Sequence, residues 1–491
     1  MKKDTIAAIA TALSDSGIGI IRVSGPEAVE ICNKIFISPS GKHLLRNAAS
    51  HTLHYGFIID AYMIKENENI PVENTDFYRN HCVIDEVMVA VMLAPRSFTT
   101  EDTVEINCHG GVLMVQKVLE QALLAGARMA EPGEFTKRAF LNGRIDLSRA
   151  EAVIDVIHSQ NEYALKSSVK QLKGDLSKEI KSLREEIIYE IAFIESALDD
   201  PEHISLDGYT ERLTEKIEAL LKSLDKLIAT ADNGKLIKEG INTVIIGKPN
   251  AGKSSLLNRM VGDERAIVTD IAGTTRDILT ETIKLKGIGL NIIDTAGIRN
   301  TEDVVEKIGV ERAKKYAVDA DLIIYVVDAS VELDENDFEI LELIRDKRTI
   351  ILLNKSDLNM KVDEESFLSF LHEKLSDNHQ TQISSNINII KTSTKENTGM
   401  EEFEQAIEDL FFEGDIKSSN EVVITNLRHK EALIDARNSL AQVMNSLELD
   451  LPEDFYSIDL MSAYSSLGYI IGEEVDDDLV TEIFSKFCLG K

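Results

Sequence analysis

The sequence has few basic residues for its length. Its 491 residues include 53 Lys and Arg against 85 Asp and Glu, which gives a formal net charge of −32 at pH 7. Binding to nucleic-acid phosphates needs clustered basic side chains. The composition therefore excludes a broad basic surface for nucleic acid, so any RNA contact must come from a local patch or a basic partner. The acidic balance by itself indicates solubility.

Cysteine is also scarce, and long apolar runs are lacking. The four cysteines are far apart and include no C-x-x-C pair: Cys32, Cys82, Cys108 and Cys488. This excludes a disulfide framework and a cysteine zinc site, and we expect reduced thiols and a cytoplasmic protein. No apolar run reaches the roughly 18 residues of a membrane-spanning helix.

Internal repeats and low-complexity tracts are absent as well, so domains must be found from changes in pattern. At ~150 residues per domain, the length predicts about three domains. Residues 1–143 contain a helical run at 112–124 and several short β-like runs, which predicts an α+β domain. The strand candidates are 5–11, 19–23, 87–93 and 103–108.

The rest of the chain changes pattern twice. Residues 144–236 and 411–491 have helical spacing, with a stripe at Ile180, Leu183, Ile187, Ile188 and Ile191 that we assign to a bundle core. Residues 237–410 instead alternate apolar strands with helices, as in a sheet with crossover helices. We therefore predict a multidomain protein in which an α/β domain is inserted into a discontinuous α-helical domain.

A glycine-rich loop follows the apolar strand 243–246 and precedes a helix-like run. It reads Gly247-Lys248-Pro249-Asn250-Ala251-Gly252-Lys253-Ser254-Ser255. This is the G-x4-G-K-S pattern in its strand–loop–helix context, in which backbone amides surround nucleotide phosphates. We expect Lys253 to reach the β- and γ-phosphates and Ser254 to bind Mg²⁺.

Base choice is indicated by a second motif after the buried strand 349–353. It reads Asn354-Lys355-Ser356-Asp357, the N-K-x-D pattern. The Asp357 carboxylate can accept from two guanine N–H groups, whereas adenine would leave it unpaired. This favours GTP over ATP. We expect Ser393, after the last strand, to support the base.

A third motif, Asp294-Thr295-Ala296-Gly297, ends another strand candidate. Asp294 is expected near Mg²⁺ and Gly297 at the γ-phosphate. Ile298 follows where a Ras-like enzyme has a water-orienting glutamine, so catalysis needs another group. Together the motifs predict a P-loop (Ras-like) G domain that hydrolyses GTP.

Motifs along the whole chain resemble the MnmE (TrmE) family, within the TrmE–Era class of P-loop GTPases. In the G domain they are Asn250, Ile298 and the run 273–277. Elsewhere they are the runs 4–11, 19–26, 98–102, 108–111, 132–136 and 483–491.

The resemblance implies potassium-assisted hydrolysis by paired G domains of a homodimer, with K⁺ in place of an arginine finger. The K⁺ ligands would be Asn250, Thr269, Ile271 and Thr274; Thr269 and Thr274 would also line the GTP site. Thr275 would join Ser254 on Mg²⁺. Glu306 would orient the attacking water, although the residue type alone is equally typical of a solvated helix.

The N-terminal domain resembles folate-binding domains of the glycine-cleavage type, which implies 5-formyltetrahydrofolate or a related folate as one-carbon donor. The implied contacts are Arg22, Glu101, Arg144 and Lys491. Arginines suit an anionic folate, and Glu101 could accept from pterin amines. Ordinary surface ion pairs are the alternative.

The resemblance further implies a heterotetramer with a FAD-dependent partner of the MnmG (GidA) type. The pair would add an aminomethyl or carboxymethylaminomethyl group to C5 of the wobble uridine of certain tRNAs, with ammonium or glycine as nitrogen donor. Cys488 lies in a C-x-G-K motif and is either a catalytic thiol or a packing cysteine.

Three other functions fit parts of the sequence. A ribosome-assembly GTPase of the Era or Der type would need a KH domain or a second G domain, and neither is visible. A non-enzymatic scaffold that uses nucleotide as a latch stays open. An ATPase is disfavoured by Asp357.

Overall fold

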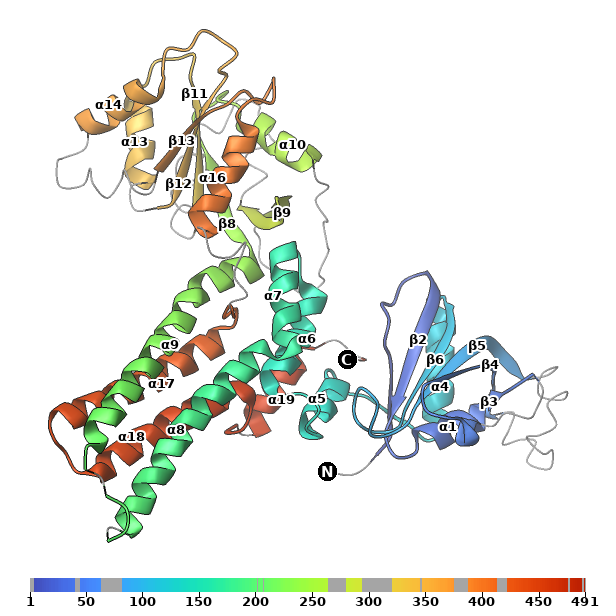
Figure 1. Cartoon of the computed structure of the whole chain (residues 1–491). Coiled ribbons are helices and arrows are strands. Elements are labelled where there is room, and N and C mark those ends of the chain that lie inside the picture. The colour runs from blue at the N-terminus through green and yellow to red at the C-terminus, as the bar shows by residue number, and fades with distance from the viewer. Residues whose placement is uncertain are drawn as a thin grey trace. The chain divides into compact units, whose positions relative to one another are not determined.

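The computed structural model describes residues 4–39, 45–62, 82–200, 202–205, 207–263, 280–293, 320–344, 347–374, 387–412, 422–475, 477–487 and 490. These form two compact units (Figure 1). Unit 1 comprises Met1–Ile154, Gln171–Ile187 and Tyr464–Lys491, and unit 2 comprises Asp155–Lys170 and Ile188–Ala463. Helical segments from both sides of the inserted α/β part therefore contribute to each unit.

Unit 1 contains a sheet with the strand order β3-β4-β5-β6-β2-β1-β7. The strands are β1 (Ile6–Ile9), β2 (Ser16–Ser24), β3 (Phe36–Ile37), β4 (Thr52–Ile59), β5 (Val83–Met92), β6 (Thr103–Gly110) and β7 (Arg128–Met129). Neighbouring strands are antiparallel except β1 and β7. The sequence analysis did not predict β3, β4 and β7; two of these are two-residue strands, too short for any periodicity.

Helices cover one face of this sheet. α1 (Ala28–Ile35) and α4 (Val112–Leu124) pack on a core that includes Ile21 and Val23 of β2. Side chains alternate along a strand, so Arg22 and Ser24 lie on the opposite face. In the pairing with β1, Arg22 lies opposite Ala8 and Ser24 lies opposite Ile6. Ile6 and Ala8 belong to a small second core, to which α5 (Glu134–Leu141) contributes Phe135. This arrangement places polar β2 side chains beside α5.

Long helices make up the flanking segments. They are α6 (Leu147–His158), α7 (Glu162–Lys173), α8 (Asp175–Asp199), α9 (Tyr209–Glu239), α17 (Leu427–Glu448), α18 (Glu453–Ile471) and α19 (Asp477–Ser485), and a 3₁₀ turn, η1 (Leu45–Asn47), lies in unit 1. In unit 2, α9 packs along α17. The predicted stripe on α8 needs one correction: Ile180, Leu183, Ile187 and Ile191 are buried, but Ile188 is exposed. Ile188 is one position from Ile187 and therefore points about 100° away around the helix.

The α/β part of unit 2 is a six-stranded sheet of order β13-β12-β11-β8-β10-β9. Its strands are β8 (Ile241–Ile246), β9 (Thr280–Leu285), β10 (Ile288–Ile293), β11 (Leu322–Asp328), β12 (Thr349–Asn354) and β13 (Ile387–Lys391). Only β9 pairs antiparallel. The edge strand β9 was not predicted; its six residues include two threonines, one glutamate and one lysine.

Helices cover both faces of this sheet, as Figure 1 shows. α10 (Lys253–Asp263) and α16 (Met400–Phe412) share one core with alternate strand residues such as Ile245 and Ile324. α13 (Glu335–Ile344) and α14 (Glu364–Lys374) share the other with Val244 and Tyr325. The predicted sheet with crossover helices is confirmed.

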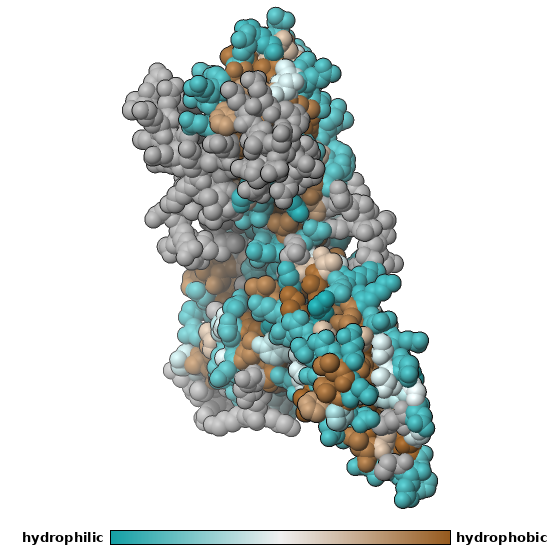
Figure 2. All heavy atoms as spheres, turned by 90° about the vertical axis from the view of Figure 1, so that its left-hand side faces the viewer, coloured by the Kyte–Doolittle hydropathy of each residue, from teal (hydrophilic) through white to brown (hydrophobic). Residues whose placement is uncertain are grey.

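The surface shows no extended apolar band on the face drawn in Figure 2, where hydrophilic and hydrophobic residues are interleaved over the coloured atoms. None of the helices in the described part of the chain is long and apolar enough to cross a membrane.

Candidate functional site

The phosphate-binding loop connects β8 to α10 at the carboxyl end of the parallel strands. Asn250 has φ 61° and Gly252 has φ 108°, both in the left-handed region. Asparagine tolerates this region better than most residues. A Cβ at Gly252 would lie 2.1 Å from the Asn354 side-chain nitrogen, so any other residue there would displace the Asn354 side chain. The loop conformation therefore favours asparagine at position 250 and glycine at position 252.

Lys253 begins α10 and turns back over the loop. Its Nζ donates to the backbone carbonyls of Gly247 and Lys248, both at 2.7 Å. Burial lowers the pKa of Lys253 to about 8. A desolvated ammonium at a helix N-terminus favours an anionic ligand, so this site fits nucleotide phosphates. Ser254 and Ser255 follow in the first turn of α10.

Lys248 fixes the outer side of the loop by contacts with two aspartates. No role was predicted for this residue from the sequence. The Lys248 ammonium lies 2.6 Å from Asp337 and 3.1 Å from Asp334. Asp337 is buried and also accepts from the Tyr325 hydroxyl at 2.6 Å. These contacts raise the pKa of Lys248 despite its partial burial. The outer side of the loop is thereby tied to α13 and β11.

The predicted base-reading motif lies against the predicted phosphate loop. Asn354 at the end of β12 donates to the Ala251 carbonyl at 2.8 Å and accepts from the Thr394 backbone N–H at 3.2 Å. Ser393 donates to the Asp357 carboxylate at 2.7 Å, which lowers the pKa of Asp357 and keeps it an ionised acceptor. The structure thus brings Asn354, Asp357 and Ser393 together with the P-loop.

Lys355 has the left-handed φ of 66° and lies 2.5 Å from Asp328 at the end of β11. Strain of this kind is typical of functional loops that neighbouring contacts hold in place. The Lys355 pairing also lowers the pKa of Asp328, although burial acts in the opposite direction.

The remaining nucleotide-site and terminal predictions lie outside the described residues. They are Thr269, Ile271, Thr274, Thr275, Asp294, Thr295, Ala296, Gly297, Glu306, Cys488 and Lys491. The other three cysteines are free and buried, and burial raises the pKa of Cys108 to about 11.

Polar residues of unit 1 form a second cluster on the α5 side of the sheet. Arg22 lies 2.8 Å from Glu105 and donates to the Gly490 carbonyl at 3.2 Å. Its guanidinium lies 5.7 Å from the Phe98 ring, and that of Arg144 lies 5.0 Å from the same ring. Arg22 and Arg144 are thus brought together around Phe98, with the penultimate residue of the chain beside them.

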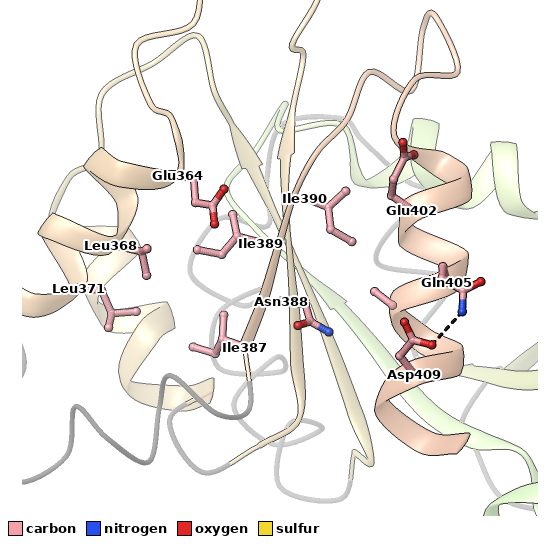
Figure 3. A pocket seen from close by; sticks show the side chains of 11 residues that line it. Glu364, Leu368, Leu371, Ile387, Asn388, Ile389, Ile390, Glu402, Gln405 and Asp409 are labelled. Atoms are coloured by element: carbon pink, nitrogen blue, oxygen red, sulfur yellow. Dashed lines mark hydrogen bonds between the residues drawn. The ribbon is translucent and has the colours of Figure 1, made fainter. Parts of the chain in front are cut away.

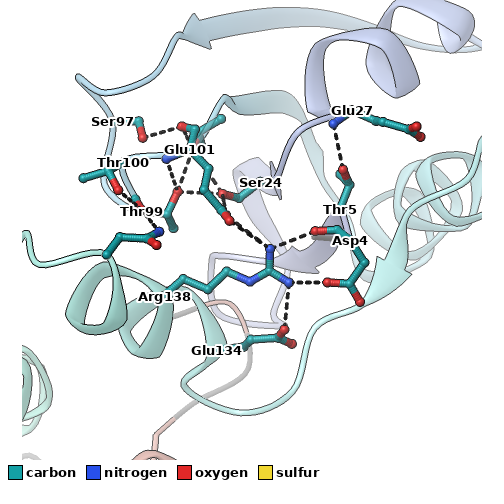
Figure 4. A network of polar contacts seen from close by, with 12 residues as sticks. Asp4, Thr5, Ser24, Glu27, Ser97, Thr99, Thr100, Glu101, Glu134 and Arg138 are labelled. Carbon is teal, nitrogen blue, oxygen red and sulfur yellow. Dashed lines mark hydrogen bonds and ion pairs between the residues drawn. The ribbon is translucent and has the colours of Figure 1, made fainter. Parts of the chain in front are cut away.

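Glu101 belongs to the same cluster (Figure 4). It accepts from the Ser24 hydroxyl at 3.2 Å, and Ser24 is two residues from Arg22 on the same strand face. Arg138 of α5 pairs with Glu101, and Asp4 and Glu134 surround the same guanidinium. The sequence analysis missed Arg138, although its position four residues after Glu134 puts the two on one helix face.

A separate cavity of about 650 Å³ flanks the edge strand β13 between α14 and α16 (Figure 3). Its acidic side chains are Glu364, Glu402 and Asp409, and Asp409 accepts from Gln405 at 2.8 Å. Acidic lining disfavours phosphate, and no lining residue belongs to the P-loop or the N-K-S-D motif. We therefore do not assign the nucleotide to this cavity.

Two family descriptions match the chain over almost its whole length. The "GTP-binding protein TrmE N-terminus" family matches residues 5–144, and the "MnmE helical domain" family matches residues 147–488. The chain belongs to the MnmE family of tRNA modification GTPases. The predicted resemblance and the multidomain fold class are confirmed, and membership makes the chain a GTP hydrolase.

Relatives in the MnmE family align from end to end. The chain is 55% identical over 491 residues to the tRNA modification GTPase MnmE of Lachnoclostridium phytofermentans, covering 100% of both chains. It is 48% identical to the protein of that name from Clostridioides difficile, covering 99% of each. It is 44% identical to the protein of the same name from Bacillus pumilus, and the match covers 99% of this chain and 100% of the relative.

Two solved structures resemble part of this MnmE family member. The match to Aquifex aeolicus Era bound to GDP·AlF4⁻ has 26% identity and a TM-score of 0.26, covering 42% of this chain and 67% of that one. The match to the T. maritima FeoB G domain has 24% identity and a TM-score of 0.23, covering 35% and 98%. Scores this low carry no argument about function.

Proposed function

We propose that this protein hydrolyses GTP with the help of K⁺ and Mg²⁺ and acts in the modification of the wobble uridine of certain tRNAs. The observation that supports the GTP part is the contact of Asn354 with Ala251, at 2.8 Å, which joins the strand end that leads to Asp357 to the predicted phosphate loop. Family membership supports the tRNA part, because the relatives are named tRNA modification GTPases.

We assign the two metal ions to residues of the phosphate loop and of the segment that follows α10. Ser254 would hold Mg²⁺ together with Thr275, and Asn250 would hold K⁺ together with Thr269, Ile271 and Thr274. When bound, K⁺ supplies positive charge at the bridge between the β- and γ-phosphates. The side-chain oxygen of Asn250 suits a monovalent cation, and the exposed, left-handed Asn250 lies at the loop tip. Glu306 would orient the attacking water.

The nucleotide proposal is tested by GTP turnover of the full chain in matched potassium and sodium buffers. We expect fast turnover only in potassium, and Asn250→Ala should reduce the difference between the two salts. Equal turnover in both salts would contradict a role for K⁺. Asp357→Asn should shift preference from guanine toward xanthine nucleotides, because the amide presents a donor where the carboxylate accepts.

We further propose that the polar cluster of unit 1 binds 5-formyltetrahydrofolate or a related folate as one-carbon donor. Arg22, Arg144 and Lys491 would face the anionic end of the folate, and Glu101 would accept from its pterin amines. Two observations support this assignment: Arg22 and Arg144 lie around Phe98, and Glu101 accepts from Ser24 on the strand that carries Arg22. Calorimetric titration with 5-formyltetrahydrofolate tests it, and unaltered affinity in Arg22→Ala would remove that residue from the site.

The wider assembly belongs to the same proposal. A cytoplasmic homodimer would act with a FAD-dependent partner of the MnmG (GidA) type to add an aminomethyl or carboxymethylaminomethyl group at uridine C5. The corresponding domains would be residues 1–143, 144–236, 237–410 and 411–491, with Cys488 near the modification chemistry or in packing. Nucleoside analysis of tRNA from cells that lack the protein is the decisive test. If the wobble uridine still carries its modification in those cells, the proposal is overturned.

A further inference from the structure

Arg138 of α5 contacts the carboxylate to which the folate proposal assigns the pterin. We infer that Arg138 is a positioning residue, which holds Glu101 in the orientation that accepts the 2-amino group of a pterin. This inference rests on the proposed folate site and adds to it a residue outside the implied contacts.

One nitrogen of the Arg138 guanidinium, Nη1, contacts both oxygens of the Glu101 carboxylate. It lies 3.2 Å from Oε2 and 3.3 Å from Oε1, and it also donates to the Asp4 backbone carbonyl at 2.8 Å. The second nitrogen, Nη2, donates to the Asp4 carboxylate at 2.7 Å and to Glu134 at 3.0 Å. Arg138 is only 9% exposed. A guanidinium held by three neighbours in a shielded place fixes the plane of the carboxylate it binds.

Glu101 keeps acceptor capacity for a ligand. A carboxylate has about four lone-pair sites, two on each oxygen. Oε2 accepts from Ser24 and from Arg138, and Oε1 accepts from Arg138, so one lone pair remains on Oε1. The Glu101 side chain is 24% exposed, which leaves room for a ligand to reach it. The remaining acceptor can receive an N–H of the pterin 2-amino group.

The backbone before Glu101 is also constrained. Thr100 has φ 62°, a region that β-branched residues rarely adopt. Asn142 donates to the Thr99 carbonyl at 2.7 Å, and the Glu101 backbone N–H donates to the Thr99 hydroxyl at 3.3 Å. Strained backbone persists where surrounding contacts hold it, and it is typical of ligand-binding loops. The loop and Arg138 therefore constrain the same carboxylate.

Arg128 provides a matched control. It pairs with the same acids as Arg138, 2.7 Å from Asp4 and 2.6 Å from Glu134, at a more exposed position. Among the contacts of the described residues, Glu101 receives a guanidinium from Arg138 and not from Arg128. Arg128→Gln thus removes similar ion pairs without touching the proposed acceptor.

The experiment measures two affinities for the full-length protein by calorimetry: one for 5-formyltetrahydrofolate and one for its analogue without the 2-amino group. Wild type should prefer the amino compound by about 10-fold to 100-fold, because the analogue leaves the remaining Glu101 acceptor without a donor. Arg138→Gln and Glu101→Gln should lose most of this preference, whereas Arg128→Gln should keep it. Arg138→Lys keeps the charge but lacks the second nitrogen that bonds Asp4 and Glu134, so it should recover only part of the preference.

Each outcome decides between the hypotheses. If Arg138→Gln lowers both affinities equally and leaves the ratio unchanged, Arg138 is merely structural and the inference is overturned, while the folate site stands. If wild type binds neither compound, the folate proposal fails and this inference fails with it. If Arg138→Gln does not fold, Arg138→Lys takes its place, and a full wild-type ratio in that variant overturns the role of the guanidinium in orienting Glu101.

Discussion

The side-chain amide of Asn354 donates to the backbone carbonyl of Ala251 over 2.8 Å, so the strand end that carries the base-reading motif is joined directly to the phosphate loop. Asn354 is buried, and its side-chain oxygen accepts from the Thr394 backbone N–H. One amide therefore links three loops that are distant in sequence, and the nucleotide contacts predicted for them depend on it.

Replacing Asn354 by alanine should weaken nucleotide binding and the G domain together. The change leaves the Ala251 carbonyl and the Thr394 N–H without this partner, which costs about 1–3 kcal/mol. We expect the affinity for a fluorescent GDP analogue to fall about tenfold or more, since about 1.4 kcal/mol corresponds to a factor of ten. Asn336→Ala, at an exposed position on α13, serves as control. Wild-type affinity in Asn354→Ala would show that the loops keep their arrangement without it.

Nucleotide binding should take up a proton at Lys253 in alkaline solution. Burial lowers the pKa of Lys253 to about 8, so in the free protein the amine is partly neutral above that pH. Phosphates favour the charged form and raise the pKa again. Calorimetry in buffers of different ionisation enthalpy should therefore detect uptake that is larger at about pH 8.5 than at about pH 6.5. Equal uptake at both values would contradict the low pKa.

The pair of Lys248 and Asp337 should show strong energetic coupling. Asp337 is 1% exposed, and breaking a buried pair leaves an uncompensated charge. We expect Lys248→Met alone to destabilise the G domain by about 2–4 kcal/mol and Asp337→Asn to offset part of this in the double variant. The measurement is the free energy of unfolding in urea. The G-domain transition is identified as the one that moves to higher urea when GDP is added. Strictly additive effects in the double-mutant cycle would argue against the anchoring contact.

Stability of unit 1 should fall in acid because of Asp4. Its hydrogen bond with Arg128, followed by that with Arg138, lowers the pKa of the Asp4 carboxyl, so the unfolded chain binds this proton more readily. The stabilisation is present above the unfolded value of about 4 and is lost as the pH falls through the folded value. Thermal unfolding between about pH 6 and pH 3 should show a flatter profile for Asp4→Asn than for wild type. Asp15→Asn, on an exposed turn, should follow the wild-type profile.

Much of the fold was predictable because its signals are local. The strand and helix runs around the P-loop follow the apolar period, and the predicted helix 112–124 agrees with α4. The strand β4 was missed although half of its side chains are buried. Ile188 was wrongly assigned to the core. The apolar spacing along a helix does not show which of its residues the neighbouring helices cover.

The sequence alone determined the nucleotide class and the family, since the G-x4-G-K-S and N-K-S-D motifs are contiguous and their chemistry depends on short-range backbone geometry. Only the tertiary structure decided which side chains meet across long separations. Arg138 reaches Glu101 over 37 positions, Lys248 reaches Asp337 over 89, and Arg22 reaches Gly490 over 468. Such pairs depend on strand register and helix packing, which are determined by the whole core. They produce no periodic pattern in the sequence from which they could be predicted.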